Sequence, residues 1–269
     1  MTDHLHRELA PISEAAWEAI DAEAKARLTT NLAARKLVDF VGPHGWSYSV
    51  TNLGRTSPIP GPSEGVHAVQ RRALPLVELR AEFTVARLEI DDFERGATDL
   101  DLSQLDAAAG QIAQAENVTV FHGYPAAGIQ GIIESTSHDR VLLAEDVESY
   151  PSGVARATDL LRQAGIAGPY GLAIGPELYT RIIETTEHGG HLLLDHLRQI
   201  LGGPLVWAPG VEGGAVVSLR GGDYLFDCGQ DLSVGYLDHD AGTVRLYLEE
   251  SFSFRALEAD AAVALSLGA

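Results

Sequence analysis

Residues 46–62 are dense in glycine and proline, and this run constrains the fold more than any other part of the sequence. Proline fixes one backbone dihedral and lacks an amide hydrogen, so the run excludes a helix and a regular central strand. A compact domain rarely holds a loop of this length without structure of its own. The run is therefore either disordered or an extended arm that finds its partners on another subunit. Three apolar residues spread along it, Val50, Leu53 and Ile59, favour the arm.

Both helices and strands are predicted outside this run. Ser13 is a residue type that caps helix N-termini, and apolar residues at three- and four-residue steps after it predict a helix. Alternating apolar and polar residues over 77–85 predict a strand with one polar face. Further predictions are an amphipathic helix over 99–116, with 117–124 leading out of it, alternating helices and strands over 151–219, and strands over 224–248. The predicted fold class is therefore α+β.

Charge and cysteine content exclude several functions. The 269 residues include 38 acids and 19 bases, a formal net charge of −19. Nucleic acids and anionic membranes are bound through clusters of Lys and Arg, so neither is expected as a partner. Cys228 is the single cysteine, which excludes an intrachain disulfide and suits a reducing compartment. The sequence shows no signal peptide and no apolar run long enough to span a membrane, so we expect a cytoplasmic protein.

The sequence contains only weak candidates for catalytic or metal-binding residues. Gly61–Gly65 matches the nucleophile-elbow pattern of serine hydrolases around Ser63, but prolines surround it and no apolar strand precedes it. His191 and His196 are five residues apart, which places them on different faces of a helix and argues against a metal site. Glu249 and Glu250 point to opposite faces of a strand, and we interpret both as solvated charge. We therefore predict that the chain is not an enzyme and uses no metal or other cofactor.

A set of short stretches runs in order from the first ten residues nearly to the last twenty. They are Arg7–Ile12 with Trp17, Ile20 and Asp21, Gly42–Trp46, Leu74–Arg80 with Phe83 and Thr84, Glu94–Ala97, Gly168–Tyr170, Arg220–Tyr224, Gly229–Tyr236 and Glu250–Phe254. Together they resemble the encapsulins, the shell proteins of bacterial and archaeal nanocompartments, once grouped with linocin-type bacteriocins. Single matches carry little weight, whereas the ordered set is very specific.

The resemblance implies the fold of tailed-phage major capsid proteins (Hong Kong 97-type), with a peripheral domain, an axial domain and an extended loop. Residues 1–45 are then the N-terminal helix and the start of the peripheral domain, and 46–72 are the extended loop that clasps a neighbour. Residues 73–122 contain the spine helix, 123–222 form the axial domain, and 223–269 return to the peripheral domain as C-terminal strands.

The resemblance further implies a self-assembling shell subunit that encloses a cargo enzyme, either a peroxidase or a ferritin-like iron oxidase. Family members capture such enzymes through a C-terminal targeting peptide, which lies in an apolar groove on the inner wall. Carried over to this chain, the cargo-binding residues are Arg35, Asp39, Asp231, Leu232 and Val234. The family's loop at the fivefold opening corresponds to Glu184, Glu187, His188 and His191. Closed icosahedral symmetry needs sixty equivalent positions in its smallest form, so we expect on the order of sixty copies.

Other interpretations of the sequence stay open. A prophage-type capsid protein would share the fold but package DNA instead of protein. A cytoplasmic hydrolase would use Ser63 or a histidine. At the level of single residues, Leu232 and Val234 could equally be core positions of a strand without any role in binding.

Overall fold

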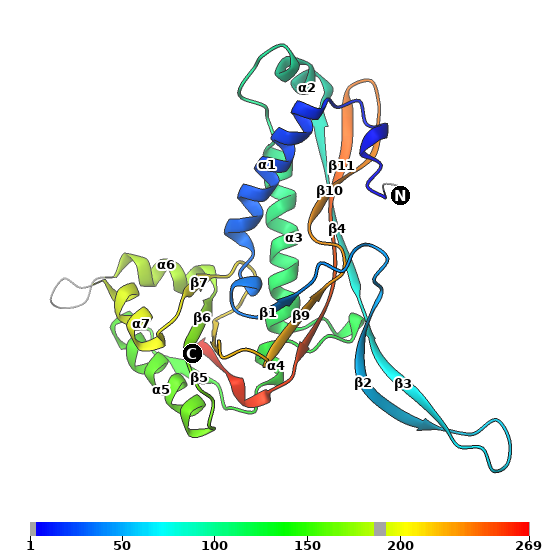
Figure 1. Ribbon diagram of the computed structural model, residues 1–269. Helices are drawn as coiled ribbons and strands as arrows, with labels where there is room; N and C mark the ends of the chain where they lie inside the picture. The colour runs from blue at the N-terminus through cyan, green and yellow to red at the C-terminus, as the bar shows by residue number, and fades with distance from the viewer. Residues whose placement is uncertain (1–3, 186–191, 269) are drawn as a thin grey trace.

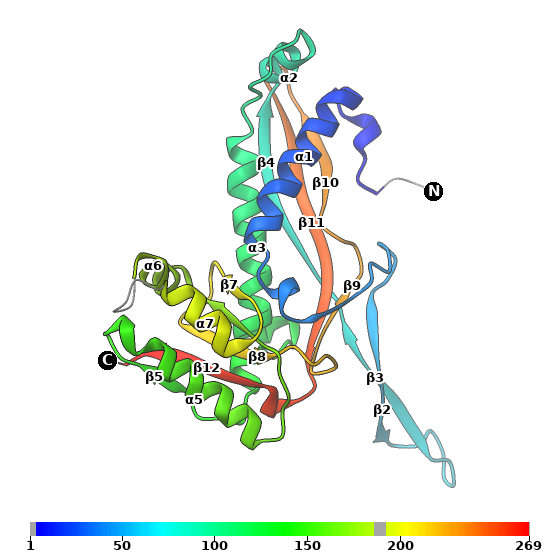
Figure 2. The same ribbon diagram turned by 60° about the vertical axis from the view of Figure 1, so that its left-hand side comes forward.

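The computed structural model describes residues 4–185 and 192–268. Within them, two five-stranded sheets lie in different parts of an elongated molecule, and a two-stranded ribbon projects from it (Figure 1). The view turned by 60° shows the same projection from a second side (Figure 2). None of the described helices is long and apolar enough to cross a membrane. The predicted α+β class is confirmed.

The first sheet is built around one long strand that pairs with neighbours on both of its edges. Its strands are β1 (Asp39–Val41), β4 (Val77–Ala86), β9 (Tyr224–Cys228), β10 (Ser233–His239) and β11 (Thr243–Ala256). β10 and β9 pair in succession with β11, β4 pairs with β11 in antiparallel register, and β1 joins β9 in parallel. β4 is the strand that the alternating pattern predicts, and its Phe83 and Val85 are buried. β10 is the last strand in the order of this sheet.

Three helices accompany this sheet, namely α1 (Glu14–Asn31), α2 (Arg87–Glu94) and α3 (Ser103–His122). Ser13 caps α1 as predicted, because its hydroxyl accepts a hydrogen bond from the amide of Ala16 at 3.3 Å. α1 packs on α3, which in turn packs on β4 and β11. α3 corresponds to the helix expected over 99–116, but it begins later, at Ser103. It also continues to His122, into the residues 117–124 that were expected to lead out of it. It continues because Val120 and Phe121 extend its buried face to a glycine of positive φ, Gly123.

The second sheet has the order β5-β12-β8-β6-β7. Its strands are β5 (Val141–Leu143), β6 (Tyr170–Ile174), β7 (Leu205–Trp207), β8 (Gly214–Ser218) and β12 (Ala262–Leu267). The helices of this region are α4 (Ile132–Ser135), α5 (Tyr150–Gln163), α6 (Pro176–Glu184) and α7 (Leu193–Leu201). Short 3-10 turns connect elements of both regions: η1 (Arg7–Leu9), η2 (Ala34–Lys36), η3 (Pro125–Ala127), η4 (Val147–Ser149) and η5 (Ala259–Ala261). The alternation of helix and strand predicted over 151–219 is confirmed.

Strand β12 departs from the expected organisation, which assigned residues 223–269 as a whole to the peripheral strands. It lies instead in the second sheet, parallel to β5 and antiparallel to β8. The physical reason is its composition, since Ala262–Leu265 is apolar without alternation and buried throughout. Such a run fits a strand with neighbours on both edges and both faces covered. The turn η5 after β11 lets the chain cross to that position.

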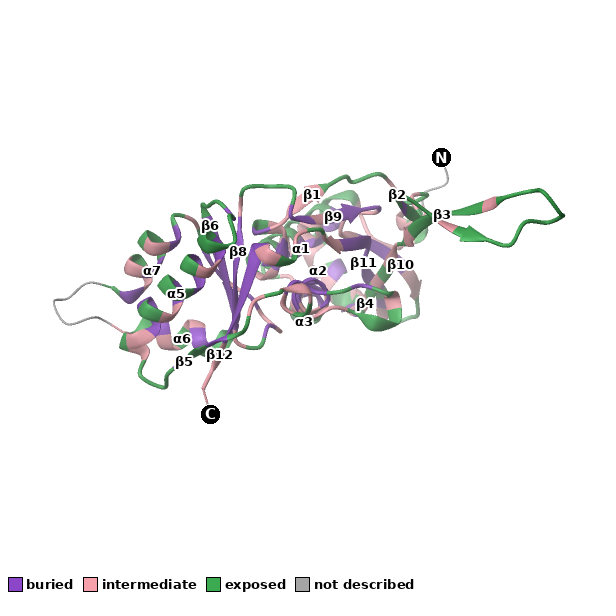
Figure 3. Cartoon of the chain, turned by 90° about the horizontal axis from the view of Figure 1, so that it is seen from below, coloured by how far each residue is buried: buried purple, intermediate pink, exposed green. Residues whose placement is uncertain are grey.

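The arm is a two-stranded antiparallel ribbon of β2 (Val50–Ile59) and β3 (Ala68–Pro75). The two strands pair with each other, so the arm is neither disordered nor without backbone partners in its own subunit, and its expected contacts with another subunit stay a prediction. Glycine and proline are tolerated because each strand of a two-stranded ribbon keeps one free edge. Seen from below, the ribbon is almost entirely exposed, whereas buried residues gather in the two sheets (Figure 3). Val50 and Ile59 remain 42% and 44% exposed. This agrees with the expectation that the arm does not bury its apolar residues within its own subunit.

Candidate functional site

An open groove of about 450 Å³ lies between α1, the start of β10 and the N-terminal residues. Its apolar lining comes from one face of α1 and from the paired strands β10 and β11. These residues are Ala24, Leu28, Leu32, Leu232, Val234 and Leu248. Charged residues complete the lining, namely Arg7, Asp21, Lys25, Arg35 and Asp231. The groove therefore offers an apolar surface bordered by charges of both signs.

The N-terminal segment forms one wall of the groove. Arg7 bonds Asp21 of α1 at 2.7 and 3.2 Å, and its guanidinium lies 4.1 Å from the ring centre of Trp17. The carbonyl of Leu5 accepts a hydrogen bond from the amide of Tyr236 at 2.8 Å, on the edge of β10. These contacts hold the segment across α1 and β10, so the groove has a fixed width on this side.

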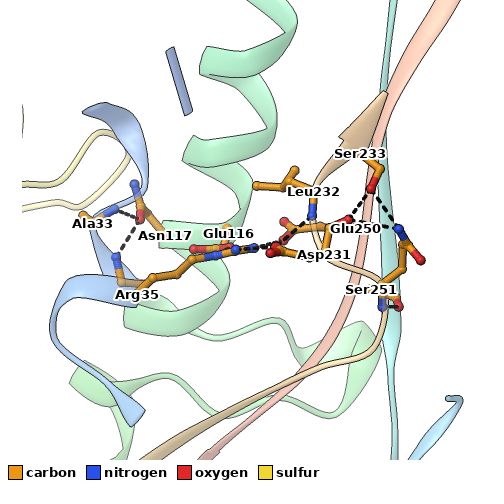
Figure 4. Close-up of polar contacts among 11 residues, drawn as sticks. Ala33, Arg35, Glu116, Asn117, Asp231, Leu232, Ser233, Glu250 and Ser251 are labelled. Carbon is orange, nitrogen blue, oxygen red and sulfur yellow. Dashed lines mark hydrogen bonds and ion pairs between the residues drawn. The ribbon is translucent and has the colours of Figure 1, made fainter. Parts of the chain in front are cut away.

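At the inner end of the groove, the guanidinium of Arg35 contacts three carboxylates (Figure 4). Its Nε donates to Glu116 of α3 at 2.6 Å, its Nη1 to Asp231 at 2.6 Å, and its Nη2 to Glu250 of β11 at 2.7 Å. The side chains of Glu116 and Glu250 are fully buried, whereas that of Asp231 is 44% exposed. Charge-assisted bonds of this kind are short and directional. One arginine therefore ties the spine helix, the long strand and the groove together.

Asn117 holds the backbone from which Arg35 projects. Its Oδ1 accepts from the amides of Ala33 and Ala34 at 2.9 and 3.1 Å, at the start of η2. Its Nδ2 donates to the carbonyls of Asn31 and Pro209 at 2.9 and 3.2 Å. The amide thus satisfies the end of α1 and the next turn, and Figure 4 shows its bonds to the backbone beside Arg35. Without these bonds, buried backbone donors would lack partners.

The electrostatics of this arginine centre favour protonation of a buried carboxyl. Burial raises the pKa of Glu116, and burial together with the charge of Glu116 raises the pKa of Glu250 well above its ordinary value. Burial opposes the charge of Arg35, but the carboxylates of Glu116, Glu250 and Asp231 outweigh it and raise the pKa of Arg35. The Oε1 atoms of Glu116 and Glu250 are buried without a hydrogen-bond partner among the described residues. A single cation facing three carboxylates therefore leaves one buried carboxyl that readily keeps its proton.

The loop before β10 presents Leu232 to the groove. The carboxylate of Asp231 accepts from the amide of Leu232 at 2.8 Å, and the hydroxyl of Ser233 donates to the carbonyl of Asp231 at 2.7 Å. Gln230 donates to that hydroxyl at 2.8 Å. The loop is thereby fixed, and Leu232 lies half-buried at the edge of the apolar cluster around α1 and β4.

Four of the five residues predicted to bind cargo lie together in this groove: Arg35, Asp231, Leu232 and Val234. Val234 is nearly fully buried, so it also has the core role that the sequence left open. The fifth, Asp39, lines a separate pocket of about 210 Å³ and accepts from the amide of Gly222 at 2.5 Å. Asp39 therefore fixes a turn between the two sheets and is not part of the groove lining.

Glu116 and Glu250 were missed, although the sequence held a signal for each. Glu250 continues the even-numbered positions of β11, which are apolar and buried on either side of it. Glu116 follows Ile112 by one helical turn on the buried face of α3. The expectation that Glu249 and Glu250 are solvated is wrong, since both are buried, although they do point to opposite faces. Glu249 pairs with Arg80 instead, whose guanidinium lies 4.0 Å from the ring centre of Tyr247.

The residues predicted to form a pore are only partly described. Glu184 is the final residue of α6 and is exposed. Glu187, His188 and His191 lie outside the described residues. Ser63 lies in the exposed loop between β2 and β3, not on a strand-to-helix turn, so it lacks the setting of a nucleophile elbow. Within residues 4–185 and 192–268, no group of three metal-ligating side chains is close enough to hold an ion.

Comparisons with known proteins place this geometry in context. Residues 1–253 match the family described as "Encapsulating protein for peroxidase". A type 1 encapsulin shell protein from Rhodospirillum rubrum is 47% identical over 267 residues, which cover 97% of this chain and 95% of that protein. The crystal structure of a virus-like particle from Pyrococcus furiosus matches with a TM-score of 0.66 at 17% identity, covering 93% of this chain and 99% of that one.

The fold extends to phage proteins. A solved chain of Mycobacterium phage Bobi matches with a TM-score of 0.56 at 13% identity, covering 89% of this chain and 91% of that one. At this identity the likeness concerns the fold alone. The predicted fold of tailed-phage major capsid proteins is confirmed.

Proposed function

Because this chain belongs to the encapsulin shell-protein family, we propose that about sixty copies close into a nanocompartment and bind a targeting peptide of a cargo enzyme in the groove. The chain is a structural shell protein that forms multi-copy, capsid-like assemblies, and it is not an enzyme. The family match overturns the hydrolase and favours a protein-enclosing shell over a prophage-type capsid protein that packages DNA. The copy number and the way in which cargo is held are our proposals.

The observation that carries the proposed cargo site is the convergence of apolar side chains and an open strand edge in one groove. β10 has one neighbouring strand in the sheet, β11, and Leu5 contacts its other edge only at Tyr236, so an extended peptide can lie along the part of this edge before Tyr236. The lining from α1 and β10 suits small aliphatic side chains, and about 450 Å³ holds only a few of them. The half-exposed carboxylate of Asp231 offers an acceptor for a backbone amide of that peptide. A short, apolar, extended C-terminal peptide fits this description.

The proposed class of cargo enzyme is inferred from the family and not from the shape of the groove. The family description names a peroxidase, and the resemblance of the sequence adds ferritin-like iron oxidases as the second class. We propose that Glu184, Glu187, His188 and His191 line the fivefold opening through which the substrate of such an enzyme enters. We further propose a cytoplasmic location, which suits the free, buried thiol of Cys228.

Light scattering on the purified protein tests the shell. About sixty copies of a 28.7 kDa chain give a particle of roughly 1.7 MDa. A monomer or a small oligomer under native conditions would contradict the proposed shell. A particle of a different size would overturn the proposed copy number only.

Leu232→Arg tests the groove. The new guanidinium would lie where an aliphatic cargo side chain must pack. An unpaired charge there costs on the order of 3 kcal/mol of binding free energy. We expect shells of normal size that retain less than about a tenth of the wild-type cargo on co-expression with an enzyme carrying the peptide. Leu142→Arg is the matched control, because Leu142 is 65% exposed in the second sheet. Normal loading of the Leu232→Arg shells would show that the peptide binds elsewhere.

A further inference from the structure

One of the three cations that line the groove has no anion beside it. Arg7 pairs with Asp21, and Arg35 pairs with Asp231 and with two buried carboxylates. Lys25 also lines the groove and is exposed. Its ammonium group forms no ion pair or hydrogen bond with any residue that the structure describes. The groove therefore contains one positive charge that a ligand can balance.

Lys25 lies towards the end of the groove that the N-terminal segment covers. On α1 it follows Asp21, the partner of Arg7, by one helical turn, which is a rise of about 6 Å. The arginine centre around Arg35 lies at the other end, beyond the last residue of α1. The free cation and the three carboxylates of the arginine centre are therefore separated along the groove.

The two ends of the groove consequently differ in charge. At the inner end, three carboxylates face the single guanidinium of Arg35, so acids outnumber the cation even when one buried carboxyl keeps its proton (Figure 4). The negative end of the helix dipole of α1 adds to this charge. Towards the N-terminal segment, the pair of Arg7 and Asp21 is neutral and the charge of Lys25 remains. An anionic group of a ligand is thus repelled from the inner end and attracted to Lys25.

A peptide at the C-terminus of a cargo enzyme carries such a group, because its last residue ends in a carboxylate that is ionised at neutral pH. The free edge of β10 before Tyr236 comprises Ser233, Val234 and Gly235, which span about 10 Å in an extended strand. At Tyr236 the carbonyl of Leu5 occupies this edge. A peptide that lies along β10 therefore meets the N-terminal segment after a few residues, which favours a chain end at this position.

We propose that Lys25 binds the terminal carboxylate of the cargo peptide and thereby fixes the direction in which the peptide lies. The peptide then runs from Asp231 towards the N-terminal segment, parallel to β10. The inference rests on the proposed cargo groove and names the group that one of its residues recognises. An acidic side chain within the peptide is the other anion that Lys25 could bind. The terminal carboxylate is favoured because every C-terminal peptide has one and because Leu5 blocks the strand edge beyond this position.

Competition between two cargo probes for full-length shells tests this contact. Each probe is a fluorescent protein that ends in about the last twelve residues of a peroxidase that loads into wild-type shells. The second probe has another colour and three glycines after the natural terminus, which move the carboxylate by about 10 Å. When both are co-expressed with the shell protein, we expect purified wild-type shells to contain the natural terminus in about fivefold excess, the effect of one exposed ion pair.

Variants of the shell protein assign this preference to Lys25. Lys25→Met should bring the ratio of the two probes to about one, Lys25→Glu should lower it below one, and Lys25→Arg should keep the preference. Lys36→Met is the matched control, because Lys36 is the other lysine of the sequence and lines a different pocket. It should give the wild-type ratio, and exchanging the two colours should leave every ratio unchanged.

The outcomes separate this contact from the proposed function. If no peroxidase loads into wild-type shells, or if Leu232→Arg shells load normally, the proposed cargo groove fails and the contact fails with it. If loading depends on Leu232 but wild-type shells take both probes equally, or keep their preference in Lys25→Met, only the contact is wrong. Equal losses of both probes in Lys25→Met would assign Lys25 to an acidic side chain and also overturn it. A preference that only Lys25→Met and Lys25→Glu abolish supports the contact.

Discussion

Arginines occupy two opposite settings in this subunit. Arg35 lies inside, in contact with three carboxylates from elements far apart in the chain, and its side chain is 16% exposed. The arginines of the ribbon lie outside and have no partner in the described structure. A desolvated charge is tolerable only with partners in place, whereas an exposed charge remains hydrated until a partner arrives. The first setting therefore belongs to folding of the subunit, and the second to its assembly.

Removal of the ribbon takes away the exposed arginines, and we expect it to have the largest effect, which is on closure of the shell. Thr51 and Leu74 are register partners, so a short Gly/Ser linker can replace residues 52–73 without moving the chain on either side. We expect a folded subunit that no longer closes, because the ribbon contributes almost nothing to the intrachain core. Circular dichroism should remain nearly native while sedimentation shows monomers or small oligomers. Intact shells would mean that the two sheets and the spine helix hold the particle without the ribbon.

Arg35→Met removes the buried guanidinium and tests the role of the inner arginine in folding. It leaves Glu116 and Glu250 buried without their cation, and removal of one partner from a buried pair costs about 3–5 kcal/mol. The denaturant midpoint of the shell should fall accordingly, with Arg156→Met as the exposed control. Combining Arg35→Met with Glu116→Gln and Glu250→Gln removes the stranded charges and should recover most of the loss. If Arg35→Met behaves like the control, the inner arginine has no greater role in folding than an exposed one.

Glu250→Gln tests whether a carboxyl beside the inner arginine keeps its proton. We expect it to have the smallest effect, which is on the pH dependence of stability. The folded state raises the pKa of Glu250, so its proton is held more tightly than in the unfolded chain. The stability that this carboxyl contributes is therefore present below its ordinary pKa and lost as pH rises through the raised value. Thermal scans between about pH 5 and pH 8 should show the wild type losing a few degrees more than Glu250→Gln. Glu64→Gln, in the exposed loop of the ribbon, should keep the wild-type slope, and equal slopes for all three proteins would contradict a retained proton.

Much of the fold follows from local patterns, and the site follows only in part. Helix α1 and strand β4 were predicted because each has one buried face with the period of its structure. The position of β12 and the pairing of the ribbon with itself depend on contacts between distant residues, which no local pattern contains. Arg35 and Asp231 came from the resemblance to a family. Glu116 and Glu250 interrupt apolar faces, but recognising them requires knowing that a buried cation lies opposite.

The central position of β12 in the second sheet has a consequence for biosynthesis. Leu265 pairs beside Val141, and Ala264 beside Ala215, so the sheet is incomplete until the strand that follows β11 has left the ribosome. Pairings so distant in sequence form slowly and late. A nascent chain therefore exposes the edge of β5, and later that of β8, from the synthesis of each strand until β12 is made. Because this sheet closes last, an unfinished polypeptide lacks the complete second sheet, and we expect only chains that contain β12 to join a growing particle.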